Sequence, residues 1–153
     1  MITLIYPAGD FTAANIAIKL QALAYDKKIK VYIVPKHFGR KKVNVILNII
    51  NSNLIIFFIY DVDIIDVGTR DEIRYALAKR KKIISIIPTT VKWPFQASAN
   101  IKLIKYQRSN PQTLINNIQG FITDYDASKT TAIFGIALVL LSLLMLALSK
   151  EKK

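Results

Sequence analysis

Residues 54–87 read LIIFFIYDVDIIDVGTRDEIRYALAKRKKIISII and contain, in order, a strand, a loop, a helix and a second strand. The first seven residues are continuously apolar, which is typical of a central strand that is covered on both faces. Residues 69–80 carry apolar side chains at helical spacing, and residues 83–87 are again apolar and end at Pro88. This order predicts two parallel strands that are joined by a right-handed crossover.

The same alternation of strand and helix continues on both sides of this segment. Apolar, β-branched runs predict further strands at residues 2–6, 31–34 and 101–104. Amphipathic patterns predict helices at residues 11–25, 43–50 and 111–122. The predicted fold class is therefore α/β, with a doubly wound, mostly parallel sheet in a flavodoxin-like three-layer α/β/α arrangement. In such sheets ligands bind outside the carboxyl ends of the strands.

Residues 131–149 read TAIFGIALVLLSLLMLALS and carry no charge. At about 1.5 Å per residue a helix of this length crosses the roughly 30 Å hydrocarbon layer of a bilayer. A buried core helix, the alternative, would normally keep a polar stripe. We therefore expect a single-pass, tail-anchored membrane protein with its N-terminal domain in the cytoplasm. The expected parts are an α/β domain at residues 1–122, a short juxtamembrane linker at 123–130, the transmembrane helix at 131–149 and a basic tail at 150–153.

The composition restricts the kinds of site and partner. The chain has no cysteine and one histidine, His37, so a disulfide framework or a thiolate zinc site is excluded, and we expect no metal and no cofactor. The net charge of +12 indicates an anionic partner, such as a lipid bilayer or a phosphorylated small molecule. We expect no specific nucleic acid partner, because no recognition motif accompanies the charge. One basic loop offers phosphate or lipid contacts: Lys36, Arg40, Lys41 and Lys42.

The acidic turn before the helix at residues 69–80 has two interpretations. Thr69 and Glu72, three residues apart after the flexible Gly68, predict a capping box in the first turn of that helix. Alternatively, the helix dipole keeps Glu72 ionised as a nucleophile or cation stabiliser, while Asp66 handles a proton across the turn. Most enzymes that break a glycosidic bond use two carboxylates with different roles. The local residues leave both interpretations open.

Two segments, LIYPAGDF at residues 4–11 and NSNLIIFFIYDVDIIDVGTRDEIRYALAKRKKIISIIP at residues 51–88, resemble the nucleoside 2-deoxyribosyltransferase family. The resemblance covers roughly residues 2–104. The first motif of the family is matched by Tyr6, Ala8, Gly9 and Phe11. The second motif is matched by Asp66, Gly68, Glu72, Ile73, Ala76 and Lys82.

The resemblance implies a glycosyl-enzyme mechanism, in which a glutamate attacks the anomeric carbon of the sugar. Glu72 would then be the nucleophile, Asp66 the acid/base partner of the leaving base and Tyr6 the residue that orients Glu72. A homo-oligomer is also implied, and so are substrate contacts from Ala8, Gly9, Asp10, Phe11, Gly68 and Thr69. Residues 44–53 lack a carboxylate that the family has ahead of its central strand, which favours simple hydrolysis over transfer.

Two further interpretations remain. The layout is also similar to that of Toll/interleukin-receptor (TIR) domains, whose enzymatic members hydrolyse NAD through a helix glutamate. The positions that correspond would be Asp10, Ser52, Asn53 and Glu72. The third interpretation is a non-catalytic nucleotide-binding or scaffold module at the membrane, with the basic loop of residues 36–42 holding phosphate. Catalysis requires Glu72, whereas a binding module requires the basic loop.

Overall fold

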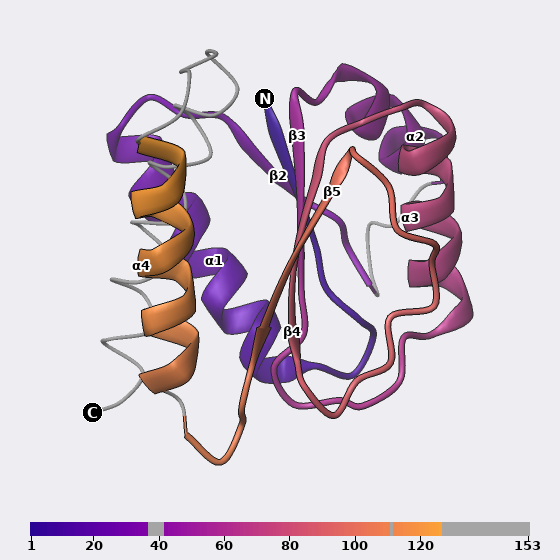
Figure 1. Ribbon diagram of the computed structural model, residues 1–153. Helices are drawn as coiled ribbons and strands as arrows, with labels where there is room; N and C mark the ends of the chain where they lie inside the picture. The colour runs from indigo at the N-terminus through magenta and orange to yellow at the C-terminus, as the bar shows by residue number, and fades with distance from the viewer. Residues whose placement is uncertain (37–41, 111, 127–153) are drawn as a thin grey trace.

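The computed structural model describes residues 1–36, 42–110 and 112–126 (Figure 1). Strands and helices alternate along these residues up to β4, as the sequence predicted, and a loop without a helix then leads to β5. The elements are β1 (Ile2–Ile5), α1 (Phe11–Asp26), β2 (Val31–Ile33), α2 (Lys42–Asn51), β3 (Leu54–Phe58), α3 (Val67–Ala78), β4 (Ile83–Pro88), β5 (Ile101–Tyr106) and α4 (Gln112–Asp126).

The strands form one five-stranded sheet in the order β2-β1-β3-β4-β5, and every neighbouring pair is parallel. Helices α1 and α4 cover one face of the sheet, and α2 and α3 cover the other (Figure 1). The strand order reverses between β1 and β3. This reversal is the topological switch point, at which doubly wound sheets open a crevice at the carboxyl ends of their strands.

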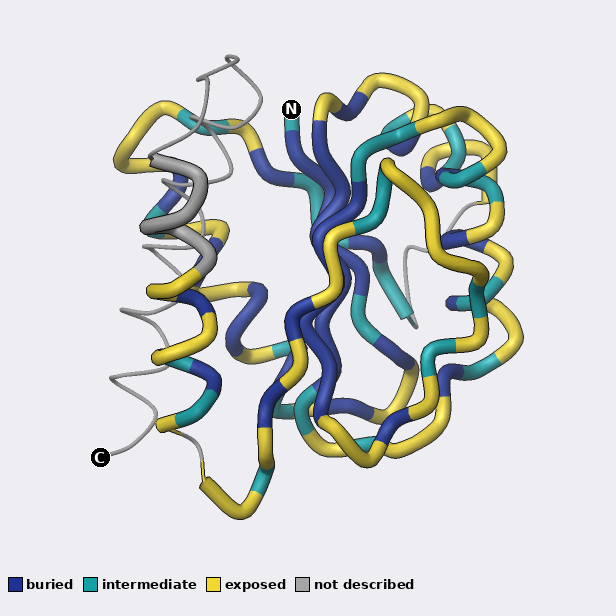
Figure 2. Tube along the Cα trace, in the orientation of Figure 1, coloured by how far each residue is buried: buried dark blue, intermediate teal, exposed yellow. Residues whose placement is uncertain are grey.

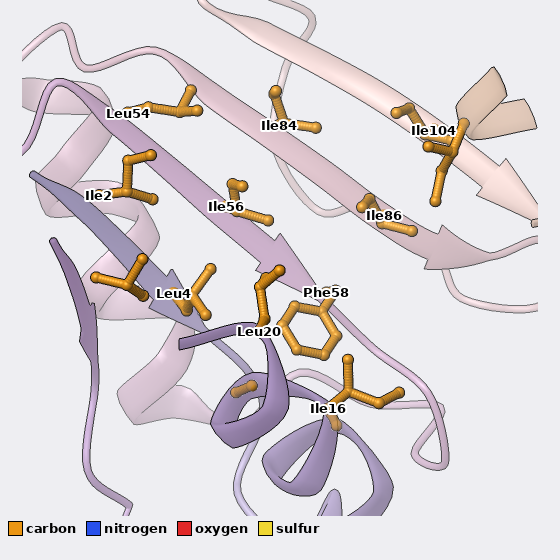
Figure 3. Packing of buried hydrophobic residues seen from close by; sticks show 14 of the residues in the cluster. Ile2, Leu4, Ile16, Leu20, Leu54, Ile56, Phe58, Ile84, Ile86 and Ile104 are labelled. Carbon is orange, nitrogen blue, oxygen red and sulfur yellow. The ribbon is translucent and has the colours of Figure 1, made fainter. Parts of the chain in front are cut away.

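The core consists of two apolar layers that the central strand β3 separates. Alternate side chains of β3 point to opposite faces, so Ile56 and Phe58 join the cluster under α1 and α4. Ile55 and Phe57 join the cluster under α2 and α3. Figure 3 shows the first layer, in which Leu20 of α1 packs against the sheet. Figure 2 shows the consequence: the central strands β1, β3 and β4 are buried along their length, and the helices are exposed on their outer sides.

Most boundaries differ from the sequence prediction by one or two residues, and two of the differences matter here. Helix α3 begins at Val67 instead of residue 69. Helix α4 continues to Asp126, so the first four residues of the predicted linker at 123–130 are helical. The apolar residues of α4 stop earlier than its backbone hydrogen bonds do, which is why an amphipathic pattern alone placed the end too early.

The predicted transmembrane helix at residues 131–149 lies outside the described residues, as does the basic tail. In the part of the chain that the structure describes, no helix has both the length and the apolar composition that crossing a bilayer requires.

Candidate functional site

Asp10 fixes the first loop at the carboxyl edge of the sheet. It is the N-cap of α1, and its Oδ1 accepts a hydrogen bond from the amide of Ala13 at 3.0 Å. Its Oδ2 accepts from the amides of Tyr60 and Asp61, at 2.7 and 3.0 Å, just after β3. The side chain is only 1% exposed. Asp10 therefore holds the β1–α1 loop against the end of β3.

Asp66, not Thr69, caps helix α3. Its Oδ2 accepts from the amide of Thr69 at 3.1 Å, and its Oδ1 accepts from the Thr69 hydroxyl at 2.7 Å. The predicted capping box of Thr69 and Glu72 is therefore wrong. Because α3 begins at Val67, Glu72 lies in the second turn of the helix and not in the first. Asp and Thr are both good caps, and the two residues lie three positions apart, so the sequence did not separate them.

Asp66 also joins α3 to the first loop, because its Oδ1 accepts from the amide of Ala8 at 3.0 Å. Burial raises the pKa of this carboxyl, but the hydrogen bonds from Thr69 and Ala8 and the charge of Lys36 outweigh it, so the pKa lies below its ordinary value. A carboxylate with a lowered pKa holds no proton at neutral pH. Asp66 is accordingly better suited to positioning than to donating a proton.

Glu72 forms a buried ion pair with Lys36. The Nζ of Lys36 lies 3.1 Å from Oε2 and 3.3 Å from Oε1 of Glu72, and both side chains are 5% exposed. Lys36 also donates to the hydroxyl of Thr69 at 2.9 Å and lies 5.9 Å from the centre of the Tyr6 ring. Thr69 and Lys36 thereby connect the two carboxylates that the sequence singled out, Asp66 and Glu72.

Of the four basic residues that were predicted to contact phosphate or lipid, the structure describes Lys36 and Lys42. Lys36 is buried against Glu72, and its predicted contact with phosphate or lipid stays a prediction. Arg40 and Lys41 lie outside the described residues. Lys42 is exposed at the beginning of α2. Sequence analysis missed the pairing of Lys36 with Glu72, although a lysine directly after a predicted strand was a signal that it would reach the carboxyl edge.

A cavity of about 450 Å³ opens between α2 and α3 beside this ion pair. Its wall is apolar on the α2 side and polar on the α3 side. The lining residues are Lys42, Val45, Ile46, Ile49, Gly68, Asp71, Glu72 and Tyr75. The volume falls within the usual range for small-molecule sites, about 300 to 1,000 Å³. Glu72 is thus the point at which the buried ion pair meets a space large enough for a ligand.

Of the predicted substrate-binding residues, Gly68 lines this cavity, whereas Thr69 and the first-loop residues 8–11 do not. Tyr6 is half-buried beside Lys36, and burial raises the pKa of its phenol, which stays neutral. Gly9 has φ +85°, a left-handed conformation that favours glycine. Phe11 is 70% exposed on α1. The structure therefore brings Tyr6, Asp66, Thr69 and Glu72 together and leaves Phe11 outside.

No protein-family model and no curated protein matches this sequence. Among solved structures, the flavodoxin-like domain of a Synechococcus protein has a TM-score of 0.51 and 8% identity, over 98% of this chain and 99% of that one. The CMP N-glycosidase BcmB of Clostridium botulinum has a TM-score of 0.49 and 18% identity, over 69% of this chain and 89% of that one. The first match supports the flavodoxin-like fold. Matches at these identities carry no information on what this chain binds or cleaves.

Proposed function

We propose that this chain hydrolyses the N-glycosidic bond of a nucleoside or nucleotide, with Glu72 as the nucleophile. The observation that carries the proposal is the position of the Glu72 carboxylate. It is 5% exposed, lies 3.1 Å from the ammonium group of Lys36 and lines a cavity of about 450 Å³. A carboxylate that is kept close to a cation and open to a cavity is available for attack on a sugar.

The first chemical step joins Glu72 to the sugar. An Oε lone pair forms a bond to C1′ while the bond from C1′ to the base nitrogen breaks, and its electron pair leaves with the base. Lys36 holds the attacking carboxylate in place and stabilises its charge before attack. Water then attacks C1′ and loses a proton to solvent, the bond from C1′ to Glu72 breaks, and free sugar and the original carboxylate are released.

The leaving base needs a proton, and Asp71 is a better candidate donor than Asp66. Asp71 lines the cavity, whereas Asp66 accepts hydrogen bonds at both oxygens and has a lowered pKa. Asp71 is 64% exposed and pairs with Arg74 at 3.1 Å, so it lies where the cavity opens to solvent. In this proposal Asp66 is a positioning residue that acts through Thr69 and Lys36.

The cavity lining suits a flat heterocycle. Tyr75 offers an aromatic ring, and the apolar side chains of α2, Val45, Ile46 and Ile49, form the opposite wall. Aromatic and apolar walls with a few polar groups are typical of sites that bury a base. The nicotinamide riboside bond of NAD is also N-glycosidic, so NAD belongs among the substrates to be tested.

A non-catalytic nucleotide-binding module is the second candidate function. It is favoured by the hydrogen bonds of Lys36 to both oxygens of Glu72, because a carboxylate that is neutralised in this way is a weaker nucleophile. A binding module needs the cavity but not the charge of Glu72.

The experiment is a test for base release by the full chain, purified with detergent. Nucleosides, deoxynucleosides, nucleotides and NAD are supplied in turn, and free base is separated by chromatography. We expect release from at least one of them, and none from Glu72→Gln. If folded wild-type protein releases no base but is stabilised against heat by one of these compounds, the binding module replaces the hydrolase.

We also propose that residues 131–149 anchor the chain in a membrane with its N-terminal domain in the cytoplasm, and that the domains associate as a homo-oligomer. The uncharged apolar run supports the anchor. Extraction of cell membranes with alkaline carbonate should leave the chain in the pellet. Release into the supernatant would contradict the anchor.

A further inference from the structure

Two residues after the end of α1, and again after the end of α3, a cationic residue adopts a left-handed backbone conformation. Lys28 has φ 60° and Arg80 has φ 55°. In each turn the next backbone amide donates to a carbonyl five residues earlier, at 2.9 Å after Lys28 and at 3.0 Å after Arg80. Glycine is the usual residue at this position of the turn. The helix dipole stabilises a cation at this position by less than the left-handed backbone costs, so local stability does not explain either residue.

Both turns lie at the amino edge of the sheet. The strand register aligns Ile2 with Val31 and Leu54, so the strands begin at one level. The two turns lead directly into β2 and β4 at that level (Figure 1, top). Exposed cations gather there, and we refer to them as the amino-edge patch. Its members are Lys27, Lys28, Lys30, Lys79, Arg80 and Lys102.

The charged residues of the described chain are distributed unevenly between the amino edge and the carboxyl edge of the sheet. Near the amino-edge patch, a carboxylate comes from Asp26 at the end of α1, and the last turn of α4 includes Asp124 and Asp126. The remaining carboxylates of the described residues follow β1 or β3 or lie in the first two turns of α3. They are Asp10, Asp61, Asp63, Asp66, Asp71 and Glu72. The amino edge is therefore the basic side of the domain, whereas the carboxyl edge carries carboxylates mixed with cations, among them Lys36, Lys92 and Arg108.

Helix α4 ends at the basic side. It runs back along the sheet from the carboxyl edge, and its last turns lie at the level of the amino-edge patch (Figure 1). In the sequence, the uncharged apolar run of residues 131–149 begins five residues after Asp126. The last described helix thus ends at the basic edge, and the apolar run follows it within a few residues in the sequence.

We propose that the amino-edge patch docks on the headgroups of an anionic phospholipid bilayer. The long lysine and arginine side chains suit a layer of phosphate and carboxylate groups, and their attraction adds up over the patch. Docking in this orientation turns the carboxyl edge, with Glu72 and its cavity, away from the bilayer. The proposal is independent of the proposed hydrolysis, and it assigns lipid contact to a different edge from the loop of residues 36–42.

The test compares a probe at each edge of the sheet in the full chain. The sequence has no cysteine, so a single introduced cysteine is labelled cleanly. Asn53→Cys places a fluorescent probe at an exposed position before β3, and Thr89→Cys places it at an exposed position after β4. The labelled chains are reconstituted into phosphatidylcholine vesicles, with and without phosphatidylserine, that carry a headgroup quencher.

We expect phosphatidylserine to increase quenching of the Asn53 probe but not of the Thr89 probe. The increase should disappear in about 1 M salt, where the Debye length falls to about 3 Å. Equal quenching of the two probes, or no effect of phosphatidylserine, would overturn the proposal. Loss of the effect on adding equimolar duplex DNA would also overturn it and would indicate a nucleic acid partner instead.

A matched pair of variants separates docking from folding. Lys28→Gly/Arg80→Gly removes two patch cations and also relieves both left-handed residues, so the fold should survive. We expect the ratio of docked to undocked domain to fall roughly fivefold for each cation removed. Lys92→Gln removes an exposed cation on the carboxyl side and should leave quenching unchanged. If Lys92→Gln reduces quenching as much as the glycine variant does, the patch has no special role.

Discussion

Lys36 and Glu72 are 36 residues apart in the sequence, yet the ammonium group of one lies 3.1 Å from the carboxylate of the other. The loop after β2 delivers Lys36, and the second turn of α3 delivers Glu72. Both side chains are 5% exposed, so each charge has lost almost all of its water. A pair in this situation is held together because separating it would leave a charge buried alone.

Removal of Lys36 should therefore destabilise the domain strongly. We expect Lys36→Met to lower the free energy of unfolding by about 3 to 5 kcal/mol, because Glu72 is left buried without its counter-ion. Chemical denaturation of the full chain measures the effect.

The double variant Lys36→Met/Glu72→Leu is the control for that experiment. It replaces both charges by apolar groups, and we expect it to recover most of the lost stability. If the double variant is as unstable as Lys36→Met, the effect comes from lost packing around Lys36 and not from the unpaired carboxylate.

Asp66 should make the stability of the domain depend on acid. Its pKa is lowered in the folded chain, because hydrogen bonds and Lys36 outweigh burial. Its contribution to stability is therefore complete above the pKa of the unfolded chain, which is about 3.9. The contribution is lost as the pH falls through the lower pKa of the folded chain. Thermal unfolding measured between about pH 2 and 7 should show that acidification lowers the unfolding temperature of Asp66→Asn less than that of wild type.

The same variant separates the two roles of Asp66. Asparagine is as good an N-cap as aspartate, so helix α3 should still begin at Val67. The charge that attracts Lys36 is lost, and we expect a cost of about 1 kcal/mol at neutral pH. A variant whose acid response equals that of wild type would show that another carboxylate is responsible.

The alternating elements could be predicted because each strand is a short apolar, β-branched run and each helix has one apolar face. The carboxyl edge as the place of a site followed from topology alone. The pairing of Lys36 with Glu72 could not be predicted, because a contact between residues 36 positions apart leaves no local pattern. The amino-edge patch could not be predicted for a related reason, since the ends of α1 and α3 come to the same edge of the sheet only after the strands align.

Arg108 should control the order of the loop after β3. Its Nε donates to the carbonyl of Tyr60 at 2.7 Å, and its other nitrogens contact the carbonyl of Val62 and the carboxylate of Asp63. The hydrogen bond and charge of Arg108 lower the pKa of Asp63. We expect Arg108→Lys to raise hydrogen exchange in residues 60–65 severalfold, because a point charge cannot replace a guanidinium fork. Unchanged exchange in these residues would contradict this role.

Two glycines should respond to alanine in opposite directions. Gly9 has φ +85°, and Gly120 lies in the helix α4. A Cβ added at either position meets no atom within 4 Å, so sterics with neighbours play no part. We expect Gly9→Ala to lower the free energy of unfolding by about 1 kcal/mol, because L-residues are strained in the left-handed region. Gly120→Ala should gain up to about 1 kcal/mol, because alanine loses less backbone entropy in a helix. Thermal unfolding of both variants against wild type measures the difference, and a gain at Gly9 would show that its left-handed conformation does not persist in solution.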